Sequence, residues 1–197
     1  MQITCFGNNS CQGTYALFIS LSRELSLAFG KFLGGRKILL ESGCYMYIGS
    51  ALGKRLSGMP LGRRLVRHAS RSHDKPPHEL RDHMIRFFQH NGLAGTNLQP
   101  PDQKKLHWHI DYLLDSQHAQ IVRVIIIRSP DRLESALSNL AASLDETFVI
   151  ARGLGARDVR NSTHLLGVRN LDSCLAALEK KIPELLNGKN ATVTSNQ

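Results

Sequence analysis

Two segments of the sequence carry side chains that suit the handling of a phosphate group. The first, residues 43–51, alternates in a way that predicts a short strand, with Tyr45 and Tyr47 on the same face. The strand ends at Gly49, whose missing side chain permits a sharp turn and a close approach by another group. A tyrosine at a strand end, a bare glycine and nearby arginines suit a phosphate site, although a buried strand with an ordinary turn gives the same pattern.

The second segment, residues 60–72, is basic and is predicted to be a helix. Pro60 suits the first helical turn, and leucine and alanine recur after it at helical spacing. Arg64 and His68 are four residues apart, so they share one helical face beside this apolar stripe. The cations expected to hold a nucleic-acid backbone through sequence-independent contacts are Lys54, Arg55, Arg63, Arg67 and Arg71.

A third group of polar residues suggests a different chemistry. Residues 106–115 alternate, which predicts a strand with His107, His109 and Asp111 on one face. Imidazole and carboxylate groups both bind zinc or iron, so this face is a secondary candidate for a metal site. The alternative is a polar strand face without a ligand.

The composition limits the class of protein. The 197 residues suit one domain, and a hydrophobic share of 42% is enough for a core. Lys and Arg number 25 against 16 Asp and Glu, a formal charge of +9 that favours an anionic partner such as nucleic acid. The four scattered cysteines predict reduced thiols in a cytoplasmic protein. No apolar run reaches the ~18 residues of a membrane span, and we expect no membrane partner.

The remaining pattern predicts an α+β fold. We expect strands near residues 13–22, 25–29, 44–48, 121–128 and 163–168, with the first three forming an antiparallel meander. Helices are expected at 60–72, at 79–90, after Ser129 and after Asp172. Residues 73–105 are interpreted as a helical insertion with a long loop at 91–105. The domain is expected to span residues 1–188, followed by a disordered tail at 189–197.

Several motifs together resemble those of the GIY-YIG nuclease superfamily. Gly13-Thr14-Tyr15, then Tyr47-Ile48-Gly49 and then Arg64 with His68 follow that order. The chain is more similar to an uncharacterised branch with Tyr-x-Tyr-x-Gly-Ser-Ala and His-Trp-His-Ile-Asp-Tyr-Leu motifs, the latter at residues 107–113. A glycine motif at 153–158 followed by His-Leu at 164–165 also recurs, so the resemblance covers residues 13–168.

The resemblance implies a fold and a site. It implies a small, mainly antiparallel sheet flanked by helices, with Tyr15, Tyr47, Arg64 and His68 as catalytic residues. It also implies a metal-holding glutamate on a later helix, which we match to Glu134. Mg²⁺, or Mn²⁺ in its place, is the expected ion, because Mg²⁺ often binds through one carboxylate and waters.

The chain departs from the superfamily pattern in three ways. Thr14 stands where the first motif has isoleucine, which is typical of the branch. Ser135 and Val159 stand where the branch has cysteines, which weakens the match of Glu134. The insertion at 73–105 is long and is able to reshape or cover the site.

These residues suit phosphodiester hydrolysis. A divalent ion on Glu134 would act as Lewis acid, and Arg64 would form a bidentate pair with the phosphate. Tyr15, Tyr47 and His68 all remain candidates for the general base, and we expect Arg64 and the metal to lower a tyrosine pKa.

Three functions are compatible with the sequence. The favoured one is a metal-dependent endonuclease that acts on nucleic acid, expected to be DNA in repair or processing. The alternative is a catalytically inactive GIY-YIG-like module that binds nucleic acid. The least favoured is a different metal enzyme built on His107, His109 and Asp111.

Overall fold

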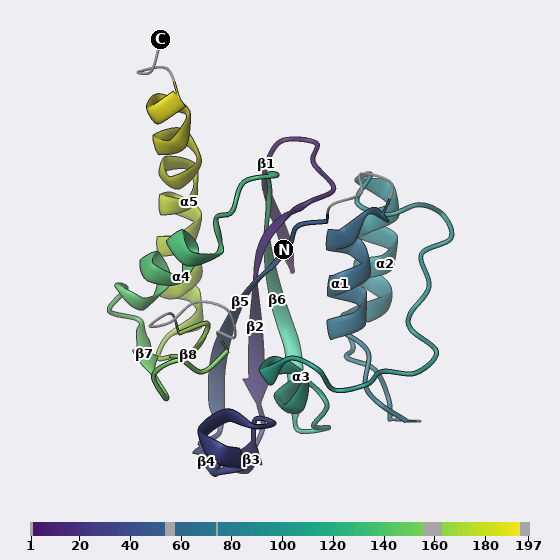
Figure 1. Cartoon of the computed structure of the whole chain (residues 1–197), viewed down its shortest axis with the longest axis vertical. Coiled ribbons are helices and arrows are strands. Elements are labelled where there is room, and N and C mark those ends of the chain that lie inside the picture. The colour runs from purple at the N-terminus through teal and green to yellow at the C-terminus, as the bar shows by residue number, and fades with distance from the viewer. Residues whose placement is uncertain (1, 54–57, 74, 156–162, 194–197) are drawn as a thin grey trace.

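A six-stranded sheet with helices on both faces forms the body of the protein (Figure 1). The computed structural model describes residues 2–53, 58–73, 75–155 and 163–193. The strand order β1-β6-β2-β5-β8-β7 combines one parallel pair, β1 with β6, and otherwise antiparallel pairs. The predicted α+β class, with a mainly antiparallel sheet flanked by helices, is therefore confirmed.

The strands of this sheet come from both halves of the chain. Their bounds are β1 Ile3–Gly7, β2 Gly13–Leu21, β5 Gly43–Ala51, β6 Ala119–Arg128, β7 Thr147–Val149 and β8 Leu165–Val168. The strands β2, β5, β6 and β8 match the sequence-based expectations, whereas the short edge strands β1 and β7 were not predicted. The central pairing of β2 with β5 sets Tyr15 directly opposite Gly49.

Alternation along the central strands divides the core into two layers. Tyr15, Leu17 and Ile19 of β2 belong to the cluster packed against α1 Pro60–His68, α2 Arg81–His90 and α3 His109–Leu114. Ala16 and Phe18 belong to the cluster packed against α4 Glu134–Ala142 and α5 Leu171–Val193. Successive side chains point to opposite faces of a strand, so β2 contributes to both layers at once.

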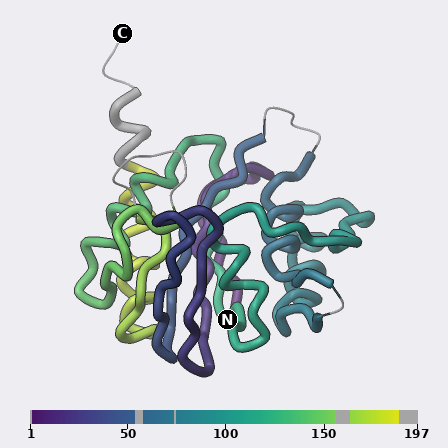
Figure 2. The backbone as a smooth tube through the Cα atoms, turned by 60° about the horizontal axis from the view of Figure 1, so that its bottom comes forward, coloured from purple at the N-terminus to yellow at the C-terminus, as the bar shows by residue number. Residues whose placement is uncertain are grey.

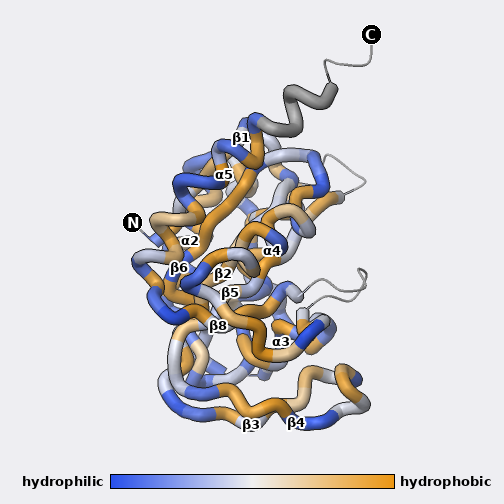
Figure 3. The backbone as a smooth tube through the Cα atoms, turned by 90° about the vertical axis from the view of Figure 1, so that its left-hand side faces the viewer, coloured by the Kyte–Doolittle hydropathy of each residue, from blue (hydrophilic) through white to orange (hydrophobic). Residues whose placement is uncertain are grey.

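The expected meander of three consecutive strands is wrong. The strands β3 Leu25–Ala28 and β4 Lys37–Leu40 pair only with each other, around the short helix η1 Phe32–Gly35. Figure 2 shows this hairpin in front of the sheet, and Figure 3 shows it set apart below the main body, with hydrophobic residues along it. Because β3 and β4 pair as a separate hairpin, β2 is left to pair with the later strands β5 and β6.

Residues 106–115 are also not a strand. The segment forms the helix α3, in which Ile110, Leu113 and Leu114 are buried at helical spacing. The Asp111 carboxylate accepts hydrogen bonds from the backbone N–H groups of His107 and Trp108 at 2.9 and 3.0 Å, which satisfies donors at the helix start. This local capping explains why an alternating sequence is helical here.

The helical insertion and the C-terminal helix differ in detail from expectation. The insertion at 73–105 carries α2, and its loop at 91–105 contains no regular element. Asn170, and not Asp172, caps α5, because its side chain accepts a hydrogen bond from the Ser173 N–H. The helix continues to Val193, past the start of the expected disordered tail; residues 194–197 lie outside the described part.

Two further observations concern the thiols and the helices. All four cysteines are free thiols.

Among the helices in the described ranges, none combines the length and apolar character needed to cross a membrane.

Candidate functional site

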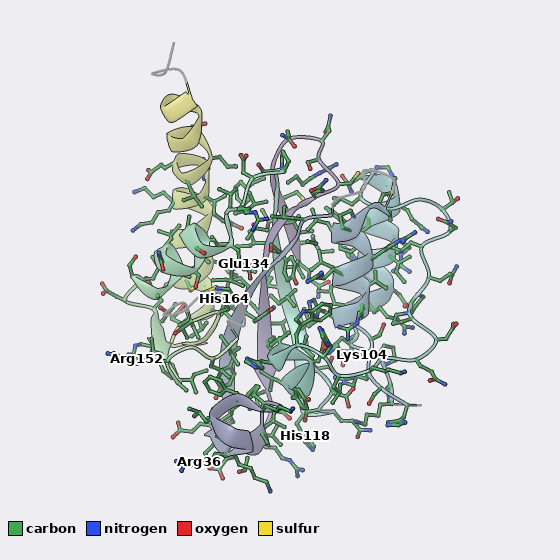
Figure 4. All side chains as sticks on the ribbon, in the orientation of Figure 1. Arg36, Lys104, His118, Glu134, Arg152 and His164 are labelled. Atoms are coloured by element: carbon green, nitrogen blue, oxygen red, sulfur yellow. The ribbon has the colours of Figure 1, made fainter. Side chains whose placement is uncertain are left out.

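A cavity of about 340 Å³ brings together residues that are far apart in the sequence. Its lining includes Tyr47 and Ser50 from β5, Arg64 from α1, and Glu134 from the first turn of α4. We call it the Glu134 pocket. The other lining residues are Leu52, Trp108, Arg132, Ser135, Gly155 and His164. Figure 4 shows Glu134 and His164 next to each other beside the sheet.

Glu134 is held in place by two neighbours. His164 Nδ1 lies 3.0 Å from Glu134 Oε1, and the Ser50 hydroxyl donates a hydrogen bond to Oε2. Partial burial raises the pKa of Glu134, but the hydrogen bonds from His164 and Ser50 outweigh it, so the pKa lies below its ordinary value. Glu134 is therefore an ionised carboxylate at neutral pH, and 29% of its side chain is exposed.

Tyr47 and Arg64 bring a phenol and a guanidinium to the same pocket. Arg64 is half-buried, and its Cζ lies 4.4 Å from the centroid of the Trp108 ring, a cation–π contact that helps to orient it. Burial raises the pKa of Tyr47, and the negative charge of Glu134 raises it further, while Arg64 lowers it by less. The expectation that Arg64 lowers the net tyrosine pKa is thus wrong, and Tyr47 is a neutral phenol at pH 7.

Tyr15 and His68 form a buried pair behind the pocket. The Tyr15 hydroxyl lies 2.8 Å from His68 Nε2, and both residues are about 1% exposed. Burial lowers the pKa of His68 to about 4, and burial raises the pKa of Tyr15 well above its ordinary value. At neutral pH the Tyr15 hydroxyl therefore donates to a neutral His68 ring. Neither side chain belongs to the pocket lining, so their link to the site runs through Tyr47, whose ring contacts both.

The Asp111 carboxylate lies next to His68 and to two cationic side chains, Arg67 and Lys104. Arg67 donates two hydrogen bonds of 2.9 Å to its two carboxylate oxygens. Lys104 Nζ lies 3.8 Å and His68 Nδ1 lies 3.6 Å from Oδ1. Burial alone raises the pKa of Asp111, but His68 and Arg67 lower it strongly, so it stays ionised. Burial also lowers the pKa of Lys104 to about 8. We call these four residues the Asp111 cluster.

Gly49 has the close approach that its sequence position predicts. A Cβ atom at residue 49 would lie 2.6 Å from Tyr15 Oη and 2.7 Å from Cζ of the same ring. Such distances lie well inside van der Waals contact, so the Tyr15 ring occupies the space of the missing side chain. The glycine therefore leaves room for the Tyr15 ring in the position where its hydroxyl meets His68.

The predicted nucleic-acid contacts separate into different classes. Arg63 is exposed, whereas Arg67 is committed to Asp111 and to the Lys105 carbonyl. Arg71 is wrong as a surface contact, because it is buried and donates to the backbone carbonyls at residues 76, 116 and 119. Lys54 and Arg55 lie outside the described residues.

The secondary metal site is not assembled. Because residues 109–114 are helical, His107, His109 and Asp111 do not share a strand face. Asp111 belongs to the buried cluster, the His109 ring packs on Phe32 at 5.4 Å, and the His107 ring packs on Trp108 at 5.1 Å. Within the part of the chain that the structure describes, no three His, Cys, Asp or Glu side chains are grouped to hold a metal ion.

Glu134 suits only a metal ion that needs few protein ligands. It offers one ionised carboxylate on an open pocket, and each oxygen keeps a lone pair beyond the one used by Ser50 or His164. Mg²⁺ prefers oxygen ligands and keeps most of its waters, so a single carboxylate fits it, whereas zinc requires more nitrogen or sulfur ligands. The residues present therefore fit hydrated Mg²⁺ or Mn²⁺.

Some residues of the pocket were not predicted as site residues. His164 and Ser50 hold the glutamate, and Trp108 holds Arg64. Ser50 and His164 belong to the motifs of the resemblance, and that was their only signal in the sequence. His164 Nε2 is buried and has no hydrogen-bond partner among the described residues. Buried polar atoms usually have a partner, so this atom distinguishes His164 from a residue that only fills space in the core.

Comparison with known proteins gives one family. A family model described as "Domain of unknown function DUF123" matches residues 14–187. No curated protein and no solved structure matches the chain.

Proposed function

The chain belongs to the DUF123 family, the domain of unknown function whose model spans residues 14–187, and we propose that it is a metal-dependent endonuclease. Its reaction would be the hydrolysis of phosphodiester bonds in nucleic acid, with DNA as the expected substrate. We also infer that the family is related to GIY-YIG nucleases. The convergence of Tyr47, Arg64 and Glu134 on one pocket carries this proposal.

The charges of the pocket suit a phosphodiester. Arg64 supplies a planar guanidinium, which pairs with two phosphate oxygens at once. Arg132 lines the same cavity and adds a second cation to its wall. The formal charge of +9 favours approach of a polyanion to the whole molecule.

Each side chain has a role that its protonation state permits. Glu134 is ionised and would hold Mg²⁺ or Mn²⁺, an ion that supplies Lewis-acid stabilisation of phosphoryl charge when bound. Tyr47 is a neutral phenol, so it would donate a hydrogen bond to a phosphoryl oxygen or orient the attacking water. His68 is neutral, but burial lowers its pKa to about 4 and makes it a weak base; it lies behind the pocket and would act only through Tyr15.

A second candidate function is a module that binds nucleic acid without cutting it. The observation that favours it is the engagement of both Glu134 oxygens, one by Ser50 and one by His164. If these contacts hold the carboxylate in an orientation that admits no Mg²⁺, no ion binds and the arginines provide binding alone.

The test is a cleavage assay on single-stranded, duplex and branched DNA and on RNA, with Mg²⁺ or Mn²⁺. Glu134→Gln and Arg64→Lys keep the size of each side chain but remove the carboxylate charge and the bidentate geometry, respectively. We expect each to lower the cleavage rate by at least about 100-fold, a typical loss for one transition-state contact.

Matched controls lie on the exposed turn between β2 and β3. Glu24→Gln and Arg23→Lys repeat the same changes far from the pocket and should cut at the wild-type rate. Cleavage by Glu134→Gln at the wild-type rate would contradict the proposed site. Binding of nucleic acid without any cleavage by the wild-type protein would select the second candidate function.

A further inference from the structure

A second hollow lies along α1, between its first turn and the loop of the insertion. Its volume is about 500 Å³, and we call it the loop pocket. Its apolar walls come from Met59, Ala94, Leu98 and Pro101. Its polar side chains are the amides of Asn97 and Gln99 and the guanidinium groups of Arg63 and Arg67.

A third hollow lies between the loop pocket and the Glu134 pocket and shares lining residues with both. This hollow, about 520 Å³, shares Arg64 and Trp108 with the Glu134 pocket. It shares Gly58, Arg63 and Arg67 with the loop pocket. The three hollows therefore lie next to one another along α1, and we treat them as one groove that runs from the Glu134 pocket to the insertion loop.

The groove has the charge that an extended nucleic-acid strand requires. Arg63, Arg64 and Arg67 line its middle section, and Arg63 is exposed. Arg67 is already paired with the buried Asp111, so the charge available to a ligand comes from Arg63 and Arg64. The middle section consequently offers positive charge to backbone phosphates, which gives a grip that does not depend on sequence.

The loop pocket itself has the chemistry of a base-binding site. A nucleobase has apolar faces and a polar edge, and the walls and amides of this hollow provide the matching groups. Asparagine and glutamine carry both a donor and an acceptor, which lets them bond to the edge of a base. Their side chains are exposed, so a ligand reaches them without prior unfolding.

We propose that the loop pocket binds an unpaired nucleobase of the strand whose phosphodiester lies in the Glu134 pocket, an inference that rests on the proposed function. A base inside a duplex has its pairing edge occupied and its faces stacked, so only an unpaired or splayed base enters such a hollow. The insertion at 73–105 thus selects single-stranded or locally open nucleic acid.

Binding without cleavage tests this inference. The probe is a fluorescently labelled twelve-nucleotide thymidine strand, titrated by anisotropy in EDTA. A matched strand keeps every sugar and phosphate but is abasic throughout. We expect the abasic strand to bind about ten-fold more weakly, which corresponds to about 1.4 kcal/mol. A uridine RNA strand of the same length is titrated in the same way. Tighter binding of the DNA or of the RNA strand identifies which of the two supplies the base.

Variants of the two amides separate base binding from phosphate binding. The double variant Asn97→Ala/Gln99→Ala should weaken binding of the normal strand by about five- to ten-fold and leave the abasic strand unchanged. Gln103→Ala, in the same loop but outside the lining, is the matched control and should bind both strands like the wild type.

The outcomes distinguish the two proposals. Equal affinity for the normal and abasic strands would overturn the base pocket and leave the nuclease proposal standing. Selective binding of the normal strand, with no cleavage of any substrate in the nuclease assay, would support the base pocket and overturn the nuclease. Absence of binding to either strand would overturn the base pocket, while cleavage of duplex or branched DNA would still support the nuclease.

Discussion

The Tyr15 hydroxyl and His68 Nε2 lie 2.8 Å apart in the buried space between β2 and α1. Because the pKa of His68 is lowered to about 4, the imidazole is neutral at pH 7 and accepts the phenolic proton. The pair fixes the orientation of two rings that both contact Tyr47, the tyrosine that reaches the pocket. It follows that Tyr15 has a structural role in the buried pair, whereas Tyr47 contacts the pocket.

Replacing each tyrosine by phenylalanine should reveal this difference. Tyr15→Phe leaves a buried His68 nitrogen without its donor, so we expect a loss of about 1–3 kcal/mol in the free energy of unfolding. Tyr47→Phe removes a hydroxyl at the pocket and should lower the cleavage rate by about 10–100-fold, with a smaller change in stability. Urea denaturation and single-turnover cleavage measure the two effects. The reverse assignment of losses would contradict these roles.

The stability of the protein should fall steeply in mild acid. Burial lowers the pKa of His68 to about 4 and that of His78 to about 3, so the unfolded chain binds more protons than the folded chain below pH 6.5. Stability therefore falls as pH falls from 6.5 toward these values, by about 2 kcal/mol per histidine at pH 5. Urea denaturation at pH 7 and pH 5 measures the change.

A variant isolates the share of His68 in this pH dependence. In His68→Gln the loss between pH 7 and pH 5 should shrink by about half, because one of two titrating groups is gone. His73→Gln, on the exposed surface, should leave the full loss in place. A His68→Gln variant with undiminished acid sensitivity would exclude this histidine as a source.

The Asp111 cluster should contribute strongly to the stability of the fold. Asp111→Asn leaves Arg67 and Lys104 without their buried counter-charge, which costs about 3–5 kcal/mol for a broken buried pair. Asp102→Asn makes the same chemical change on the exposed insertion loop and should have little effect. Thermal unfolding followed by circular dichroism compares the two, and equal melting temperatures would refute the importance of the cluster.

Gly49 should not tolerate even one methyl group. In Gly49→Ala the new Cβ would meet the Tyr15 ring at 2.6–2.7 Å, so the ring must move away from His68. We expect a loss of about 1–3 kcal/mol in the free energy of unfolding, as for other overpacked cores. Gly58→Ala is the matched control, because a Cβ there meets nothing within 4 Å and its φ is not positive. Similar stabilities of both variants would argue against the contact.

Much of the candidate site could be predicted from the sequence, because the motifs of the resemblance contain the tyrosine, arginine and glutamate side chains that suit phosphate chemistry. The convergence of Tyr47, Arg64 and Glu134 on one pocket could be inferred from the resemblance alone, since these residues come from three separate elements. Ser50 and His164 were not assigned roles, because they lie 84 and 30 residues from Glu134 in the sequence, and contacts over such separations leave no local pattern.

The main errors of the sequence-based predictions come from local patterns that are compatible with both a strand and a helix. The alternation at 106–115 suits a strand, and short apolar runs do not distinguish strands from helices. Asp111 decided the outcome by capping the start of α3 while also neutralising Arg67. Arg71 was misplaced for a related reason, since a cation on a basic helix looks solvated until the carbonyls around it are known.

Trp108 is the only tryptophan of the chain, and its indole lies 4.4 Å from the guanidinium carbons of both Arg64 and Arg67. Its ultraviolet emission therefore arises from one spot, where the groove meets the Glu134 pocket. A ligand that draws Arg64 toward itself changes the electric field on this ring, so the protein carries an intrinsic optical reporter of occupancy and needs no attached dye.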